Sequence, residues 1–418
     1  DGCCKPLQVN TIRAHSSRME ASYLQGLAAT VGLCEGLEAT GFVSYRPVDA
    51  TLTADGDIAT LLTTGYHRTE SELKRKHNAT QTLYGGRLAY AVSGFTFGAT
   101  AVATTYSRPL HPDTRQLYRR YYPQGRRFWN AGLDYGYQSY WLSFSGETAT
   151  GDSHAWATVN TATLRLSGDL SLLGVQRFCS YRYTAPMGNA PAAGGVDNES
   201  GFLLGAQWRL SQRLQLMAYG DYAYHPWPRY LVSQASSEWD GYLSATYSAG
   251  HWLFRARGRL RLSQRDNDDK TALTDRNSQR ITVSGGYDDG QWQVRSQAAF
   301  SFSQYKQHAR GYMFTQLLAR RWQRLLLSAT ASLFHTDDYE TRLYAYERGP
   351  LYTMSMPMSY GRGFRESLFL KWQLAKHIHF IGRISHLHYF DRNVISSGLQ
   401  QINGRNQTDV DLQLRLKW

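Results

Sequence analysis

Histidine and acidic residues form two clusters of the kind that can bind metals or transfer protons. The clusters are His335 with Asp337 and Asp338, and His377, His379, His386 and His388 with Asp391. Either chemistry requires these side chains within bonding distance of one another, but the second cluster's two histidine pairs flank one predicted strand near its opposite ends. No GxSxG, HExxH or glycine-rich phosphate-binding motif occurs. We therefore expect no enzyme activity and no catalytic, cofactor-binding or metal site.

Basic residues form the other chemically distinctive pattern. Arg255, Arg257, Arg259 and Arg261 alternate with apolar or small residues and so share one face of a strand. The same parity gives the full set of candidate inward-facing residues: Arg165, Arg255, Arg257, Arg259, Arg261, Lys371, Arg383, Arg415 and Lys417. Two interpretations stand. The basic residues line a path for anionic solutes, or they form ion pairs with acids on neighbouring strands, namely Asp134, Glu147, Asp221 and Asp411.

Strands must position these side chains, and a two-residue period recurs along the chain. We predict strands over residues 20–33, 36–50, 79–92, 95–108, 128–137, 140–149, 154–167, 170–185, 200–211, 213–224, 239–248, 251–264, 278–287, 291–304, 311–321, 325–346, 364–374, 378–390 and 408–418. The last is the most regular, and its apolar face holds Val410, Leu412, Leu414, Leu416 and Trp418. This pattern is typical of the strand that closes a transmembrane β-barrel.

The connections between these strands alternate in length. Short turns are expected near 93–94, 167–169, 211–212, 248–250 and 288–290, and long polar loops near 51–78, 109–127, 186–199, 225–238, 265–277, 347–363 and 391–407. Outer-membrane barrels have short turns on the periplasmic side and long loops on the extracellular side. Within the first long loop, the Thr69 and Glu72 spacing of a capping box predicts one helical turn.

Composition supports a membrane barrel. Aromatic residues make up 13% of the chain, and many tryptophans fall at predicted strand ends, where their rings favour the membrane–water boundary. Mean hydropathy is −0.49, and no apolar run reaches the roughly 18 residues of a transmembrane helix. We predict an all-β fold, a large antiparallel transmembrane β-barrel of about 18–22 strands, integral to a bacterial outer membrane.

The N-terminal region carries two further expectations. If the short turns face the periplasm, the strands at 20–33 and 408–418 run in the same direction, so an even-numbered barrel needs another strand before residue 20. Residues 3–14 provide it if residues 1–418 form one complete barrel domain. Otherwise the chain is the C-terminal part of a longer protein. The spacing of Cys3, Cys4, Cys34 and Cys179 predicts no zinc site and does not define disulfides.

Three stretches resemble a known group of proteins. They are FVSYRPVDATL to TGYHRTESELKRK at 42–76, DYAYHPWPRYLV at 221–232 and RLYAYERGPLYTMSMPMSYGRGFR at 342–365. In these the chain resembles large outer-membrane barrels of Bacteroidetes-type bacteria described as helix-hairpin-helix domain proteins. The resemblance implies a fold and a location more than a function. Those proteins typically carry a helix-hairpin-helix module, of the kind found in competence DNA-binding proteins, which this sequence lacks.

Three functions remain open. The first is a channel or transport barrel with a basic lumen, in keeping with a formal net charge of +13. The second is a non-conducting scaffold in an outer-membrane assembly or secretion complex, whose long loops plug the lumen or bind other outer-membrane proteins or lipoproteins. The third is DNA binding or uptake, which would need the missing module. The basic run at 118–122 is more typical of contact with lipopolysaccharide, so lipid and lipopolysaccharide are the expected partners.

Overall fold

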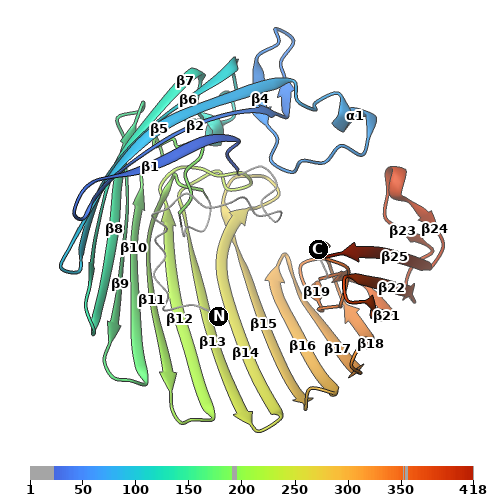
Figure 1. Ribbon diagram of the computed structural model, residues 1–418. Coiled ribbons are helices and arrows are strands. Elements are labelled where there is room, and N and C mark those ends of the chain that lie inside the picture. The colour runs from blue at the N-terminus through green and yellow to red at the C-terminus, as the bar shows by residue number, and fades with distance from the viewer. Residues whose placement is uncertain (1–22, 191–194, 352, 354–355, 418) are drawn as a thin grey trace. The chain divides into compact units, whose positions relative to one another are not determined.

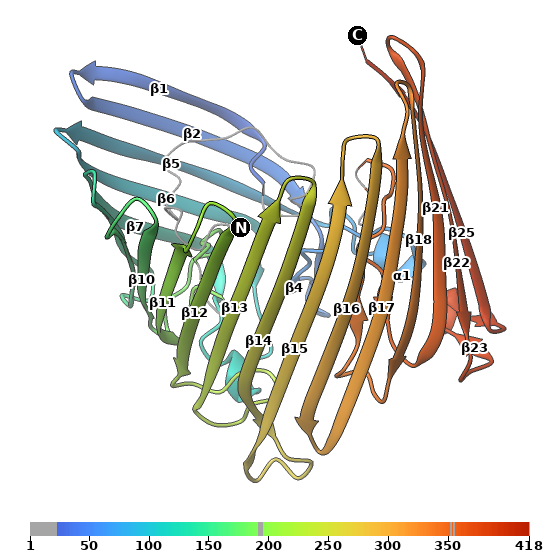
Figure 2. The same cartoon turned by 90° about the horizontal axis from the view of Figure 1, so that it is seen from below.

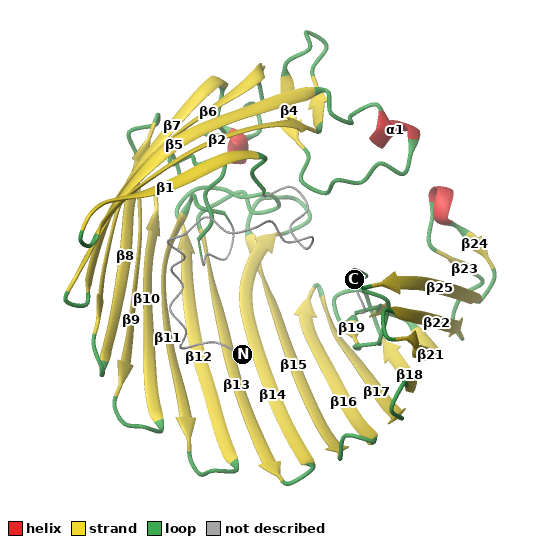
Figure 3. Ribbon diagram, in the orientation of Figure 1, coloured by secondary structure: helices red, strands yellow, loops and turns green. Residues whose placement is uncertain are grey.

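The computed structural model describes residues 23–190, 195–351, 353 and 356–417 (Figure 1). Strands dominate these residues, and the helices are single turns in loops: α1 (Glu70–Leu73), η1 (Leu117–Arg119) and η2 (Gly398–Gln400) (Figure 3). None of the helices in the described ranges has the length and apolar character needed to cross a membrane. The predicted all-β class is confirmed.

The chain divides into two compact units. One comprises Asp1–Gln207, Tyr219–Trp239 and Gln264–Thr274, and the other comprises Trp208–Ala218, Asp240–Ser263 and Asp275–Trp418. In chain order the first strands are β1 (Gly26–Cys34), β2 (Leu37–Val48), β3 (Ala50–Leu52), β4 (Ile58–Leu61), β5 (Ala79–Val92), β6 (Phe95–Leu110), β7 (Gly125–Gln138), β8 (Leu142–Gly151), β9 (Trp156–Arg165), β10 (Leu170–Cys179), β11 (Glu199–Arg209) and β12 (Leu214–His225). The rest are β13 (Ser236–Ala249), β14 (Trp252–Asp266), β15 (Leu273–Asp288), β16 (Trp292–Tyr305), β17 (Gln307–Arg321), β18 (Leu325–Thr336), β19 (Leu343–Tyr344), β20 (Met358–Ser359), β21 (Arg362–Ala375), β22 (Ile378–Tyr389), β23 (Val394–Ile395), β24 (Ile402–Asn403) and β25 (Asn406–Leu416).

Antiparallel pairing between successive long strands organises each unit. In the first unit the order is β1, β2, β5, β6, β7, β8, β9 and β10. In the second it is β15, β16, β17, β18, β21, β22 and β25, a succession that Figure 2 shows from below. The short strands β3 and β4 pair within the 49–78 loop, and β4 meets β6 in parallel at one position. Each unit is therefore a meander, which needs only local connections.

Each of the nineteen predicted strand segments coincides with a long strand, but some boundaries were wrong. The predicted strand 325–346 ends at Thr336 because a turn follows, in which the Thr341 amide donates to Asp338 Oδ1 at 3.0 Å. The predicted long loop 265–277 is short, since β14 continues to Asp266 and β15 starts at Leu273. The predicted helical turn is present as α1, with both hydrogen bonds of the Thr69–Glu72 capping box.

Alternate connections differ in length, as predicted. Every second connection between the long strands is a turn of two to four residues, and the others include the long segments 49–78, 111–124, 180–198, 226–235, 337–361 and 390–405. Three of these other connections are short: 152–155 between β8 and β9, 267–272 between β14 and β15, and the single residue Lys306 between β16 and β17, which is in a left-handed conformation with φ of 61°. Strand pairing and parity therefore gather the long loops of each unit at one end of its strands.

The two faces of the strands differ in polarity and in exposure. On β25 the apolar side chains are widely exposed, at 62% for Val410, 70% for Leu412, 63% for Leu414 and 55% for Leu416. The alternate residues Asp409, Asp411 and Gln413 are half-buried. Tryptophans predicted to lie at strand ends are also exposed, including Trp129, Trp141, Trp208, Trp252, Trp292, Trp322 and Trp372. An exposed apolar face with a covered polar face is the reverse of a soluble protein.

The buried residues lie on the polar face, where loops cover it. In the second unit Leu343 and Ala345 of the 337–361 segment pack with Met313 and Phe334 of β17 and β18. In the first unit Ile58 of β4 packs with Tyr106 and Phe128. The loops therefore provide much of the buried core in each unit.

Several predictions concern residues outside those the structure describes. These are the strand over 3–14, the start of the strand over 20–33, Cys3, Cys4 and Trp418. Cys34 is exposed and Cys179 is buried, and both are free thiols.

Candidate functional site

The arginine row lies on β14 with the predicted parity. Arg255 and Arg257 are half-buried, and Arg259 and Arg261 are exposed. Between them, the side chains of Phe254, Leu260 and Leu262 are exposed on the apolar face. The strict alternation of β14 thus puts four guanidinium groups on one face of a single strand.

Two neighbouring strands add arginines that the sequence analysis did not single out. Arg280 of β15 lies opposite Ser301, and Arg295 of β16 lies opposite Gly286. Both line a cavity of about 490 Å³ together with Arg255, Arg257 and Arg259. Parity within the predicted strands 278–287 and 291–304 would have placed both arginines on the polar face. Neither belongs to a run of alternating arginines like the one at 255–261, so neither has a local signal in the sequence.

The 337–361 segment forms the other wall of this cavity. Leu343, Tyr344, Tyr346 and Met356 line the cavity opposite the arginines. Strands β19 and β20 pair with each other and form a small hairpin within this segment. The site is therefore a pocket between a strand face and a loop folded against it, and not an open stretch of sheet.

Ion pairs and hydrogen bonds fix this loop at several points. Glu347 is buried and pairs with Arg365 of β21, with 2.6 Å between Oε1 and Nε. Glu340 accepts a hydrogen bond of 3.1 Å from Arg276 Nε of β15. At its far end the Leu351 amide donates to Gln413 Oε1 of β25 at 3.1 Å. The loop is thus tied to three different strands.

Most of the charge in the pocket is not neutralised. Arg259 pairs with Asp240 of β13, with 2.9 Å between Nε and Oδ1. Within the described ranges, no carboxylate forms an ion pair with Arg255, Arg257, Arg280 or Arg295. Arg280 Nη2 donates to the Arg342 carbonyl at 3.2 Å and Arg295 Nη2 to Gln297 at 3.3 Å, both neutral acceptors.

One arginine in the pocket also has an unsatisfied donor. Arg257 Nε is buried and has no hydrogen-bond partner among the described residues. Arg295 experiences repulsion from Arg257 and Arg255. Holding like charges together without a compensating negative charge costs free energy, so this pocket is suited to receive an anion.

The other predicted basic residues do not join this pocket. Arg383 pairs with Asp411 at 2.6 Å, which is one of the proposed ion pairs. Asp134 and Asp221 instead pair with Arg87 and Arg177, two residues that the sequence analysis did not consider. Arg165 lies in the first unit, where its guanidinium donates to the Tyr140 carbonyl. Lys371 lies on β21, Arg415 lies on β25, and Lys417 follows β25.

The predicted histidine clusters form no shared site in the described structure. His335 contacts Asp337 at 3.0 Å and stacks on Tyr312. His386 and His388 are hydrogen-bonded to Thr408 and Asn406 of the adjacent strand. One group of potential metal ligands does come together among the described residues, and it is a different one: Asp49, His67 and His77.

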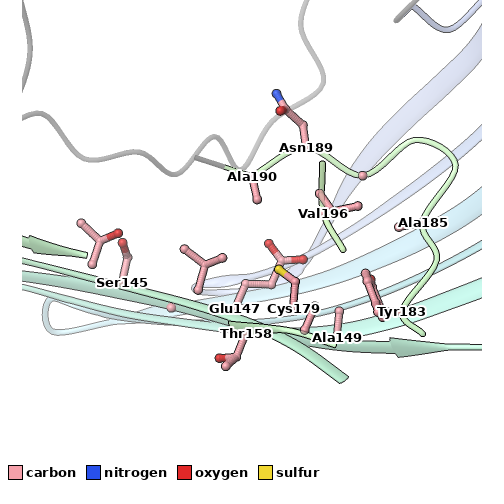
Figure 4. A pocket seen from close by; sticks show the side chains of 15 residues that line it. Ser145, Glu147, Ala149, Thr158, Cys179, Tyr183, Ala185, Asn189, Ala190 and Val196 are labelled. Carbon is pink, nitrogen blue, oxygen red and sulfur yellow. The ribbon is translucent and has the colours of Figure 1, made fainter. Parts of the chain in front are cut away.

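Glu147 lines a separate, smaller cavity in the first unit. This cavity is about 180 Å³ and lies between strands β8 to β10 and the 180–198 loop. Glu147 and Cys179 extend from the sheet toward the loop that carries Ala190 and Val196 (Figure 4). Burial raises the pKa of the loop residue Tyr183 to about 12, so its phenol stays neutral. This cavity holds a carboxylate and lacks the arginine cluster of the first pocket.

Three loops of the first unit also form an aromatic cluster. Tyr121, Tyr181 and Trp227 have ring centroids 4.9–5.3 Å apart, and Tyr181 stacks on Trp227 at 17°. The Trp227 indole N–H donates to the Leu117 carbonyl at 3.0 Å. The long loops 109–127 and 225–238 predicted from the sequence therefore contact one another.

Comparison with known proteins finds similarity in structure only. No protein-family model matches the chain, and no curated protein matches it. Among solved structures, the chain is similar to the FrpB iron transporter of Neisseria meningitidis, with 9% identity, a TM-score of 0.46, and coverage of 94% of this chain and 71% of that one. It is also similar to an anion-selective porin from Comamonas acidovorans, with 11% identity, a TM-score of 0.37, and coverage of 93% and 99%. A third is OccK8 (OprE) of Pseudomonas aeruginosa, with 9% identity, a TM-score of 0.37, and coverage of 92% and 100%.

Proposed function

We propose that this chain forms an integral β-barrel of a bacterial outer membrane and passes anionic solutes through a lumen that contains the arginine pocket. In this account Arg255, Arg257, Arg280 and Arg295 bind the passing anion, and the 337–361 loop narrows the path beside them. The proposal includes no enzymatic step.

The membrane part of the proposal rests on the exposed apolar face. Side chains such as Leu243 at 60%, Phe314 at 49% and Leu368 at 47% exposure lie on β13, β17 and β21 of the second unit. Soluble monomers rarely expose contiguous apolar patches of more than a few hundred Å². Strands can cross lipid only when every backbone group is paired, which requires a closed barrel. Lipid contact therefore accounts for the apolar side chains exposed on this face. Lipopolysaccharide is the proposed partner at the end of the strands that carries the long loops.

The solute preference rests on one observation: four arginines in the pocket have no carboxylate partner among the residues that the structure describes. Guanidinium groups donate paired hydrogen bonds to carboxylates and phosphates, and a site walled by protein strengthens such interactions. The pocket volume of about 490 Å³ is within the usual range for small-molecule sites, roughly 300–1,000 Å³. A small organic anion or inorganic oxyanion fits both the size and the charge.

Charge reversal in the pocket tests this proposal. The double variant Arg255→Glu with Arg257→Glu should reduce the ratio of anion to cation permeability by at least about fivefold. One unit charge at 4 Å is worth about 1 kcal/mol even in water, which corresponds to that factor. The matched control is Arg165→Glu, which changes a predicted inward-facing arginine outside the pocket. Equal selectivity of the double variant and the wild type, in a salt gradient across a planar bilayer, would refute the role of the pocket.

A second candidate function is a scaffold in an outer-membrane assembly or secretion complex. The observation that favours it is the aromatic loop cluster, beside which Tyr230 is 69% exposed and forms an edge contact with Tyr118. Exposed tyrosines are common at protein interfaces. Recovery of stoichiometric outer-membrane proteins or lipoproteins with the chain, lost on Tyr230→Ser, would favour this function. The resemblance to helix-hairpin-helix-associated barrels, and with it any role in DNA uptake, stays a prediction.

A further inference from the structure

Two histidines and an aspartate from the 49–77 loop lie close together, far along the chain from the arginine pocket. One potential ligand atom from each of Asp49, His67 and His77 lies within 4.8 Å of the other two. His67 Nε2 is 2.6 Å from Asp49 Oδ2, and the His67 and His77 rings are 5.7 Å apart and nearly perpendicular. The side chains of Asp49 and His67 are only 11% and 24% exposed. Three donor atoms thus converge at a partly sheltered point.

Local structure holds each of these residues in place. Asp49 follows β2 directly, and its carbonyl accepts from the Leu62 amide at 2.9 Å. The His77 amide donates to Asp49 Oδ1 at 2.8 Å, and His77 has a φ of 50°. Next to it, Asn78 forms two hydrogen bonds with the backbone of Ala50. The backbone on both sides of the loop is therefore fixed before any ligand binds.

The helical turn α1 fixes the segment between the two histidines. Thr69 and Glu72 form the capping box that begins α1, two residues after His67. The same turn places Glu72 beside Arg68 and Glu70 beside Lys74, in ion pairs of 3.1 and 2.7 Å. Arg68 and Lys74 are therefore paired with acids of the same turn, which reduces their net contribution of positive charge to the loop.

The donor set matches the chemistry of a borderline divalent metal. Imidazole nitrogen and carboxylate oxygen suit Zn²⁺, and three protein ligands leave a position for water or a solute. In a tetrahedral site with bonds of about 2.0–2.1 Å, ligand atoms lie about 3.3 Å apart. Here His67 Nε2 and Asp49 Oδ2 are 2.6 Å apart and no spacing exceeds 4.8 Å, so shifts on the order of 1 Å suffice.

We propose that Asp49, His67 and His77 form a binding site for a divalent transition metal of the zinc type in the 49–77 loop. The site is independent of anion passage through the arginine pocket, and each proposal can fail without the other. In the absence of metal, hydrogen bonds between Asp49 and both His67 and His77 hold the two ends of this loop together.

Calorimetric titration with Zn²⁺ tests the site, using the full chain in detergent after treatment with a chelator. The wild type should bind one equivalent. His67→Gln and His77→Asn should each weaken binding by more than about tenfold, because loss of even a supporting contact to a metal ligand typically costs about 10–100-fold in affinity. Asparagine tolerates the left-handed conformation of residue 77 and retains the amide that donates to Asp49.

His111→Gln provides the matched control. His111 lies 3.6 Å from Asp57 in a neighbouring loop but belongs to no group of three potential ligands among the described residues. This variant should bind Zn²⁺ as the wild type does. X-ray absorption of the zinc-loaded wild type should show two imidazole ligands. Failure of the wild type to bind Zn²⁺, unchanged binding in both ligand variants, or a spectrum without imidazole would each overturn the proposal.

Discussion

Glu347 and Arg365 form an ion pair whose side chains are only 2% and 11% exposed, although one lies in a loop and the other in a strand. The pair secures the 337–361 loop against β21, on the side of the sheet that carries the arginine pocket. Arg365 also donates to Ser385 of β22 at 3.3 Å. The position of the loop beside the pocket therefore depends on an interaction between residues 18 positions apart.

Glu347→Gln should release the loop and increase single-channel conductance. Removing one partner of a buried ion pair typically costs about 3–5 kcal/mol, because the other charge is left without compensation. Glu340→Gln is the control, since it breaks the pair with Arg276, in which both side chains are 27% exposed. We expect a clear rise in conductance for the first variant and a small one for the second. Unchanged conductance in Glu347→Gln would show that the loop does not narrow the path.

Arg257→Gln should stabilise the protein and reduce its preference for anions. The substitution removes repulsion with Arg295, and it removes the buried Nε, which has no hydrogen-bond partner within the described part of the chain. We expect stability to rise by about 1 kcal/mol, since sites arranged for function are often held at a cost in stability. Arg383→Gln is the contrasting variant and should destabilise, because Arg383 pairs with Asp411. Thermal unfolding of both proteins in the same detergent measures the effect, and a lower midpoint for Arg257→Gln would contradict this interpretation.

Much of this fold follows from side-chain alternation. A two-residue period in β25 or β14 is a local property, and it defines both the strand and its polar face. The position of the 337–361 loop is not local, because it depends on Glu347 meeting Arg365 and on Leu351 meeting Gln413. For the same reason the sequence analysis found the arginine row but missed Arg280 and Arg295, which reach the pocket through strand register.

The convergence of Asp49, His67 and His77 was also not predictable. No metal site was expected from the sequence, because the histidine pairs at 377–379 and 386–388 flank one predicted strand near its opposite ends and no HExxH motif occurs. Their approach depends on the capping box of α1 and on the hydrogen bonds of Asn78, which act across 28 residues. Only the capping box has a sequence signature. It predicts the helical turn, but it does not predict that His67 and His77 lie beside Asp49.

Gly290→Ala should weaken the hairpin between β15 and β16. Gly290 has a φ of 86°, a conformation that costs an alanine about 1 kcal/mol relative to glycine. Gly168→Ala is the control, because Gly168 lies in another short turn, has no positive φ and has open space where a Cβ would be. The thermal midpoint should fall for Gly290→Ala and stay unchanged for Gly168→Ala. Equal midpoints would mean that the turn relaxes without strain.

Lowering the pH should open the 390–405 loop only below the ordinary aspartate pKa of about 3.9. Burial disfavours the charge on Asp391, but hydrogen bonds from the Arg392 guanidinium and the Arg362 amide outweigh it and lower its pKa. A lowered pKa stabilises the folded loop above the ordinary aspartate value of about 3.9, and this contribution is lost as pH falls through the folded pKa below that value.

Hydrogen exchange of the 390–405 segment, corrected for the intrinsic pH dependence of exchange, measures this transition. Protection should persist at pH 5 and disappear well below about pH 3.9. Asp391→Asn should lower the protection already at neutral pH. Loss of protection in the wild type already near pH 6 would contradict this role of Asp391.

The most direct test of the anion pathway is the reversal potential of the purified full-length protein in a planar bilayer under a salt gradient. The arginine pocket predicts discrete conductance steps and a potential whose sign corresponds to anion movement. A cation-selective or zero potential would contradict the account. So would a silent bilayer from protein shown to be inserted, since it would mean that the 337–361 loop and the other loops seal the lumen.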